Sequence, residues 1–233
     1  VRAPQARALG LGASVVLPPA LRAPAYRAFA RAVGADVAEA ELPLGDYPTL
    51  GDFFTRRLRP GLRPLDPAPD AVLSPCDGVL AARGEVVDGA LVQAKGRTYR
   101  LAELLASEAS AARFAGGAYA TIYLSPKDYH RVHAPVGGAL LSYEHVPGAL
   151  WPVSKRFVEQ RDGLLARDER VVIDLDAGPL GRVAVVMVAA SGVGNLWLTH
   201  ADPAGEGADA PAGPGGRPRA PRGMSTTRWR GAR

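Results

Sequence analysis

Between residues 79 and 190, glycine, proline and aspartate divide the chain into short apolar runs, and this division constrains the fold more than any other feature. The runs are VLAARGEV (79–86), ALVQAKG (90–96), YATIYL (119–124), RVVIDLD (170–176) and RVAVVMVAA (182–190). Short runs bounded by turn formers are typical of strands. One expected helix, Leu101 to about Ala112, interrupts them. The sequence therefore predicts a mainly antiparallel β domain.

Helices are expected ahead of this domain. Apolar residues recur every fourth position between Leu21 and Val37, at Ala25, Phe29 and Val33, which predicts an amphipathic helix. A second, shorter helix is expected over Thr49 to Leu58, because Thr49 and Asp52 have the spacing of a capping box. Helices followed by an antiparallel sheet make an α+β fold.

The N-terminal segment is basic. Residues 1–35 contain no acid and five arginines: Arg2, Arg7, Arg22, Arg27 and Arg31. Such a helix can lie on a membrane, with arginines at the phosphates and apolar residues at the acyl boundary, or it can pack on the domain as an ordinary helix. Both alternatives stay open. The apolar run from Ala8 to Leu17 is too short to span a bilayer, and we expect it to be a retained surface segment.

The composition changes after Ala201. Residues 201–233 are dense in glycine and proline and carry six arginines, so we expect a disordered basic C-terminal tail. The predicted organisation is a basic amphipathic helical segment over 1–48, an α+β domain over 49–200 and the tail over 201–233.

Charge and cysteine content limit the function classes. The net charge of +5 makes anionic partners plausible, but no aromatic platform or reading motif accompanies the arginines, and nucleic acid is not expected. The single cysteine, Cys76, excludes an internal disulfide and cannot form a thiolate metal cage.

The densest group of reactive side chains is YLSPKDYHRVHAPVGG (123–138), which holds Asp128, His130 and His133. Flanking prolines favour a loop, and no third ligand has a recognisable spacing, so general acid–base chemistry suits these imidazoles better than zinc. Either histidine alone would ordinarily be structural. A second group, LSPCDGVL (73–80), places Asp77 in a turn, where either histidine could be its partner. No metal site is expected.

These segments resemble, in order, the signature blocks of bacterial phosphatidylserine decarboxylases. The matching blocks are FFTRRLRPGLRPLD (53–66), SPCDG (74–78), QAKGRTY (93–99), YLSPKDYHRVHAP (123–135), HVPGALWPVS (145–154) and LLARDERVVIDLD (164–176). The resemblance covers roughly residues 20–200, and several ordered blocks are far more specific than a single short motif.

The resemblance implies a carboxy-lyase that makes phosphatidylethanolamine and CO2 from phosphatidylserine. In this family a zymogen cleaves itself at a serine of a Leu-Gly-Ser-Thr-like motif, and the serine becomes a pyruvoyl cofactor. By motif match, Asp77 and His133 would serve the self-cleavage, and His130 would assist decarboxylation or reprotonate the α-carbon. Expected partners are phosphatidylserine and an anionic phospholipid membrane, at the cytoplasmic face of the bacterial cell membrane. A homodimer is left open.

The C-terminal segment departs from the family pattern. No Leu-Gly-Ser-Thr sequence occurs, and the nearest string places Met224 before Ser225, which makes Ser225 a weak candidate for the pyruvoyl precursor. We therefore expect a truncated or frameshifted, and inactive, decarboxylase. The alternative is a non-catalytic module, either a membrane-surface binder or a lipoyl- or biotinyl-like carrier with Lys95 as the modified residue.

Overall fold

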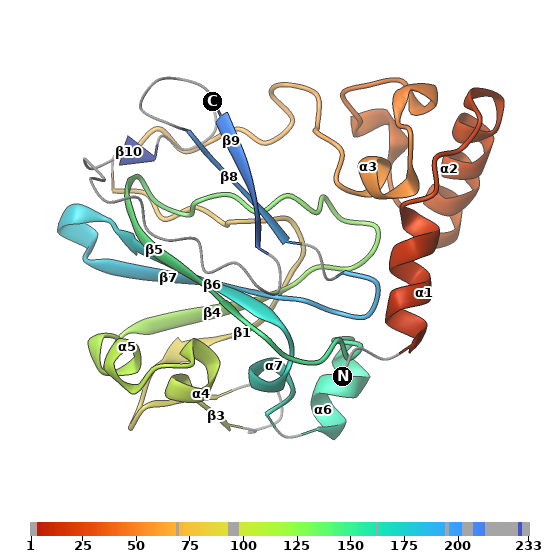
Figure 1. Cartoon of the computed structure of the whole chain (residues 1–233). Coiled ribbons are helices and arrows are strands. Elements are labelled where there is room, and N and C mark those ends of the chain that lie inside the picture. Colours follow the sequence, from red (N-terminus) through yellow and green to blue (C-terminus); the bar gives the residue numbers. More distant parts are fainter. Residues whose placement is uncertain are drawn as a thin grey trace.

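The N-terminal part of the chain is helical, and strands follow it (Figure 1). The computed structural model describes residues 4–68, 70–92, 98–161, 163–193, 196–201, 207–212 and 228–229. The described helices are α1 (Pro4–Ala13), α2 (Pro19–Val33), α3 (Leu50–Phe54), α4 (Leu101–Leu105), α5 (Glu108–Arg113), α6 (Lys155–Gln160) and α7 (Leu164–Arg167). The 3-10 turns η1 (Val37–Glu39) and η2 (Leu44–Asp46) lie between α2 and α3, and η4 (Gly178–Leu180) lies between two later strands.

The strands pair in antiparallel ladders, which confirms the α+β prediction. They are β1 (Val79–Glu85), β2 (Ala90–Val92), β3 (Thr98–Arg100), β4 (Ala118–Tyr123), β5 (Gly138–Val146), β6 (Arg170–Asp176), β7 (Arg182–Val188), β8 (Leu196–Ala201), β9 (Gly207–Ala212) and β10 (Arg228–Trp229). The largest sheet has the order β10-β5-β6-β7, and three pairs, β1-β4, β2-β3 and β8-β9, accompany it.

Three expected helices have bounds that differ from the prediction. Gly34, with a φ of 81°, ends α2, so the helix does not continue to Val37 as expected. The helix expected over 101–112 is divided in two, because Ala106 has a φ of 53° and the Ser107 side chain then caps α5. The capping box of Thr49 and Asp52 is confirmed, although α3 ends at Phe54, short of Leu58.

The N-terminal helices have a core of their own. Tyr26 and Ala30 of α2 are buried with Tyr47 and with Phe53 of α3, and the rings of Tyr26 and Phe53 stack with centroids 5.3 Å apart. The face of α2 built on Tyr26 and Ala30 thus packs on the rest of this unit. This packing is what the second alternative, an ordinary helix packed on the domain, predicts for α2. Ala25, which was expected on the apolar stripe of the helix, is exposed.

The second core lies between α4, α5 and one face of the sheet (Figure 1). Leu101 and Leu105 of α4 pack with Val172 of β6 and Val186 of β7. Burial of such side chains contributes about 1.5–3 kcal/mol each, so this layer holds the helices on the strands that support the loops described below.

The domain boundaries stay a prediction. Phe53, which lies beyond the expected boundary at residue 48, packs in the N-terminal core. Within 201–233 the described segments, Gly207–Ala212 and Arg228–Trp229, have strand geometry and pair with β8 and β5. Apart from Ala201, the last residue of β8, the rest of that range, with Ser225, lies outside the described residues, as does Lys95.

Candidate active site

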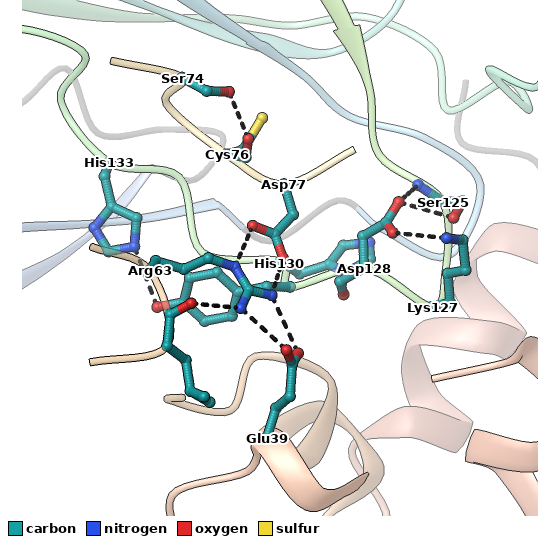
Figure 2. A network of polar contacts seen from close by, with 12 residues as sticks. Glu39, Arg63, Ser74, Cys76, Asp77, Ser125, Lys127, Asp128, His130 and His133 are labelled. Carbon is teal, nitrogen blue, oxygen red and sulfur yellow. Dashed lines mark hydrogen bonds and ion pairs between the residues drawn. The ribbon is translucent and has the colours of Figure 1, made fainter. Parts of the chain in front are cut away.

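Two segments far apart in sequence lie side by side at the site. The Leu73 amide donates to the Pro135 carbonyl at 2.8 Å, and the His133 amide donates to the Pro75 carbonyl at 2.6 Å. These bonds place the turn that holds Asp77 against the loop from β4 to β5 (Figure 2). Gly78, with a φ of 121°, allows the approach: a Cβ there would lie 2.4 Å from the Tyr123 carbonyl oxygen.

Arg63 holds the Asp77 carboxylate with two hydrogen bonds. Its Nε donates to Asp77 Oδ1 at 2.9 Å and its Nη2 to Oδ2 at 2.6 Å, while the same guanidinium also donates to both oxygens of Glu39 (Figure 2). The hydrogen bonds from Arg63 hold the pKa of Asp77 below its ordinary value, and the Tyr129 amide adds to this. Asp77 is therefore an ionised, fixed carboxylate at neutral pH.

His130 is fixed from two sides. Its Nδ1 lies 2.8 Å from the Asp128 carbonyl oxygen, and its ring lies against Phe54 of α3 with centroids 3.8 Å apart. A carbonyl oxygen can only accept, so we assign the proton to Nδ1 and the free lone pair to Nε2. Burial lowers the pKa of His130, which keeps the imidazole neutral at pH 7.

His133 lies beside Tyr129. Its Nε2 is 3.2 Å from the Tyr129 hydroxyl oxygen, and the two rings stack with centroids 5.6 Å apart. Burial, and secondarily the charge of Arg131, lowers the pKa of His133, whereas the charge of Asp77 acts in the opposite direction. This histidine is also neutral at pH 7.

Asp128 shapes the loop that carries both histidines. Its Oδ2 accepts from the Ser125 amide at 2.7 Å and from the Ser125 hydroxyl at 2.8 Å, and Lys127 Nζ lies 3.5 Å from Oδ1. The turn directs the Asp128 carbonyl at His130. The side chain of Asp128 thus acts on the site through the backbone.

The structure brings Asp77, His130 and His133 into one region, as Figure 2 shows, but the expected carboxylate–histidine hydrogen bond is replaced by the Arg63 pair. Among the described residues, neither histidine hydrogen-bonds to Asp77. Arg63, Glu39 and Phe54 are site residues that the sequence patterns do not single out, although Arg63 and Phe54 lie within the FFTRRLRPGLRPLD block.

Comparison with known proteins identifies the family of the chain. A model of the phosphatidylserine decarboxylase family matches residues 50–218. The chain belongs to the phosphatidylserine decarboxylase family. It is 51% identical over 190 residues to a phosphatidylserine decarboxylase proenzyme of Anaeromyxobacter sp. (strain K), which covers 82% of this chain and 67% of the relative.

Other members of the family are similarly close. The proenzyme of Brevibacillus brevis is 46% identical over 166 residues, or 71% of this chain and 59% of the relative. That of Myxococcus xanthus is 42% identical over 192 residues, or 82% of this chain and 68% of the relative. The chain thus spans about 59–68% of the length of these relatives. The resemblance read from the blocks is confirmed, and nothing favours a lipoyl- or biotinyl-like carrier.

Proposed function

We propose that the chain carries the acid–base half of a phosphatidylserine decarboxylase, which converts phosphatidylserine to phosphatidylethanolamine and CO2. The observation that supports this most directly is the arrangement of two neutral imidazoles, each with its own anchor, next to an ionised carboxylate. General acid–base catalysis requires groups that can exchange a proton near neutral pH. The family supplies the reaction class.

The site fits a pyruvoyl cofactor in the chemistry that its described residues offer. A pyruvoyl group supplies a ketone that acts as the electron sink when an amine-bearing substrate loses its carboxylate. Making that group from a serine needs a base close to the hydroxyl, and His133 is half-buried, neutral and aligned by its backbone bond to Pro75. Ser225, the candidate precursor, lies outside the described residues.

Each residue is assigned a role from its geometry. His133 takes up a proton at Nε2. Asp77 stays ionised through Arg63, and its negative charge favours the protonated form of His133. His130, whose Nδ1–H is held by the Asp128 carbonyl, has its lone pair at Nε2, which takes up a proton from solvent before the imidazolium gives that proton to the substrate α-carbon.

We also propose that the protein works at the surface of an anionic membrane, on the cytoplasmic face. The support is a group of exposed apolar side chains on α1, the following loop and the start of α2: Leu9 (56% exposed), Leu11 (73%), Val15 (54%), Val16 (65%) and Leu21 (55%). Arg27 and Arg31 of α2 are exposed as well. None of the helices in the described part of the chain is long and apolar enough to cross a bilayer.

The function is tested in a chimera in which residues 1–201 precede a C-terminal segment carrying the family's Leu-Gly-Ser-Thr motif. We expect two product chains on a gel and release of CO2 from phosphatidylserine vesicles. His133→Ala and Asp77→Asn should block chain cleavage. His130→Ala should permit cleavage but slow decarboxylation at least about a hundredfold.

The control is Arg83→Gln, which replaces an exposed residue of β1 and should change neither chain cleavage nor CO2 release. Normal cleavage and CO2 release in all three site variants would reject the assigned roles. A chimera that folds but never releases CO2 would reject the proposed function.

A further inference from the structure

A second basic and aromatic surface is formed by Trp151, by Arg161 just after α6, and by residues of α7; both helices are labelled in Figure 1. It is a cavity of about 320 Å³ lined by Trp151, Arg161, Leu164 and Arg167. The Arg161 guanidinium lies over the Trp151 ring, 4.3 Å from its centroid, and 39% of Trp151 is exposed. We refer to these four residues as the Trp151 surface.

The backbone of Trp151 is held while its side chain stays at the surface. Its amide donates to Asp168 Oδ1 at 3.0 Å, and its carbonyl accepts from the Ser191 amide at 3.2 Å. Leu150 beside it is buried with Ala189. The indole is therefore presented by a rigid frame and has few conformations to lose on contact with a partner.

The positive charges of Arg161 and Arg167 are accessible to a binding partner. Both are exposed, and among the side chains that the structure describes no carboxylate pairs with either of them. The segment 151–167 has four basic residues (Lys155, Arg156, Arg161, Arg167) and two acidic ones (Glu159, Asp162), a net charge of +2. This charge favours an anionic partner.

The Trp151 surface is connected to the apolar side chains of α1. A Cβ built on Gly192 would lie 3.6 Å from Leu9 Cδ1, so the loop after β7 lies close to α1. The neighbouring Ser191 is the residue that donates to the Trp151 carbonyl. The loop at Ser191 and Gly192 thus lies near Leu9 of α1 and is hydrogen-bonded to the backbone of Trp151.

We propose that the Trp151 surface is a second membrane contact, at which the indole lies at the level of the headgroups and Arg161 and Arg167 bind lipid phosphates. Tryptophan concentrates at membrane interfaces, and guanidinium groups bind phosphate with several hydrogen bonds. The partner is a bilayer containing anionic phospholipid. This inference rests on the proposed membrane association, and adds the surface that orients the protein on the bilayer.

The test uses the full chain and vesicles of phosphatidylcholine with and without phosphatidylglycerol, a lipid that is anionic but not the proposed substrate. Arg161→Gln/Arg167→Gln should weaken binding to the anionic vesicles roughly tenfold or more. The matched control, Arg83→Gln/Arg100→Gln on β1 and β3, removes the same charge and should bind as the wild type. Thermal melts check that all variants are folded.

Tryptophan fluorescence locates the contact. We expect a blue shift and quenching by brominated lipid on binding, and Trp151→Phe should remove most of this response while binding persists. If the anionic vesicles bind with unchanged affinity after the double substitution, and Trp151→Phe keeps the full response, the Trp151 surface is rejected and membrane association stands. If the wild-type protein binds no vesicles, both the Trp151 surface and the proposed membrane association are rejected. Equal weakening by the control pair would show a net-charge effect and would also overturn the inference.

Discussion

Asp168 is a fully buried carboxyl group whose Oδ2 has no hydrogen-bond partner among the described residues. Burial raises its pKa from 3.8 to about 6, so the folded state holds this proton more tightly than the unfolded state. The ionised form therefore costs stability above pH 6, and the cost disappears below about pH 4. We predict that Asp168→Asn, which retains an acceptor for the Trp151 amide, stabilises the protein by about 1–3 kcal/mol at pH 7.5.

Denaturant unfolding at several pH values measures this effect, and the gain should shrink as the pH falls from 6 to 4. Asp168→Ala is the control, because it removes both the charge and the acceptor for the Trp151 amide. A loss of stability in Asp168→Asn at pH 7.5 would mean that attraction to Arg170 outweighs the cost of burial.

Phe54 sets the environment of His130 by covering the imidazole at 3.8 Å between centroids. Phe54→Ala should admit water to the ring, so the pKa of His130 should rise toward its ordinary value of 6.5. His133 is an internal control, because its own burial and Arg131 lower its pKa and its ring packs on Tyr129. Histidine NMR titration of the folded variant measures both. An unchanged His130 titration would show that Phe54 does not control it.

The sequence predicts which residues carry the chemistry of the site, but it does not predict the residues that contact them. Turn chemistry and the signature blocks indicate Asp77 and the two histidines as site residues. Arg63 binds Asp77 from 14 residues away, and Phe54 meets His130 from 76 residues away. Such pairs depend on how the segments fold back, which neither local periodicity nor turn propensity records.

At the scale of elements, Gly148 joins the loop after β5 to the segment before β6. A Cβ at this position would lie 2.4 Å from both the Asp168 carbonyl carbon and the Glu169 nitrogen. These are backbone atoms, so the clash cannot be relieved by a side-chain rotation. We predict that Gly148→Ala destabilises the protein by more than about 2 kcal/mol. Gly137→Ala is the matched control, since nothing lies within 4 Å of its Cβ position. Thermal denaturation compares the two, and equal melting temperatures would contradict this packing.

Elements with strong local signals were predicted well. The capping box of α3 and the strands β1, β4, β6 and β7 lie close to where the sequence placed them. The strand β5 was missed because two glycines precede its apolar residues and because His145, a polar side chain, is buried on it beside Glu169 at 3.3 Å. Tertiary pairing, and not a period of two, makes this strand.

For the whole molecule, we predict that this 233-residue polypeptide neither cleaves itself nor decarboxylates phosphatidylserine. The proposed function needs a pyruvoyl group made from the chain itself, and its formation requires a serine hydroxyl to approach the preceding carbonyl closely, which glycine permits more readily than Met224. The role proposed for neutral His133 is to deprotonate this hydroxyl, and a hydroxyl that does not reach the preceding carbonyl leaves that step without a reaction. Intact-mass measurement should give one uncleaved species, and a ketone-reactive hydrazide should label nothing. Two fragments separated at Met224–Ser225, the smaller one blocked by a pyruvoyl group, would establish Ser225 as the cofactor source and reverse this prediction.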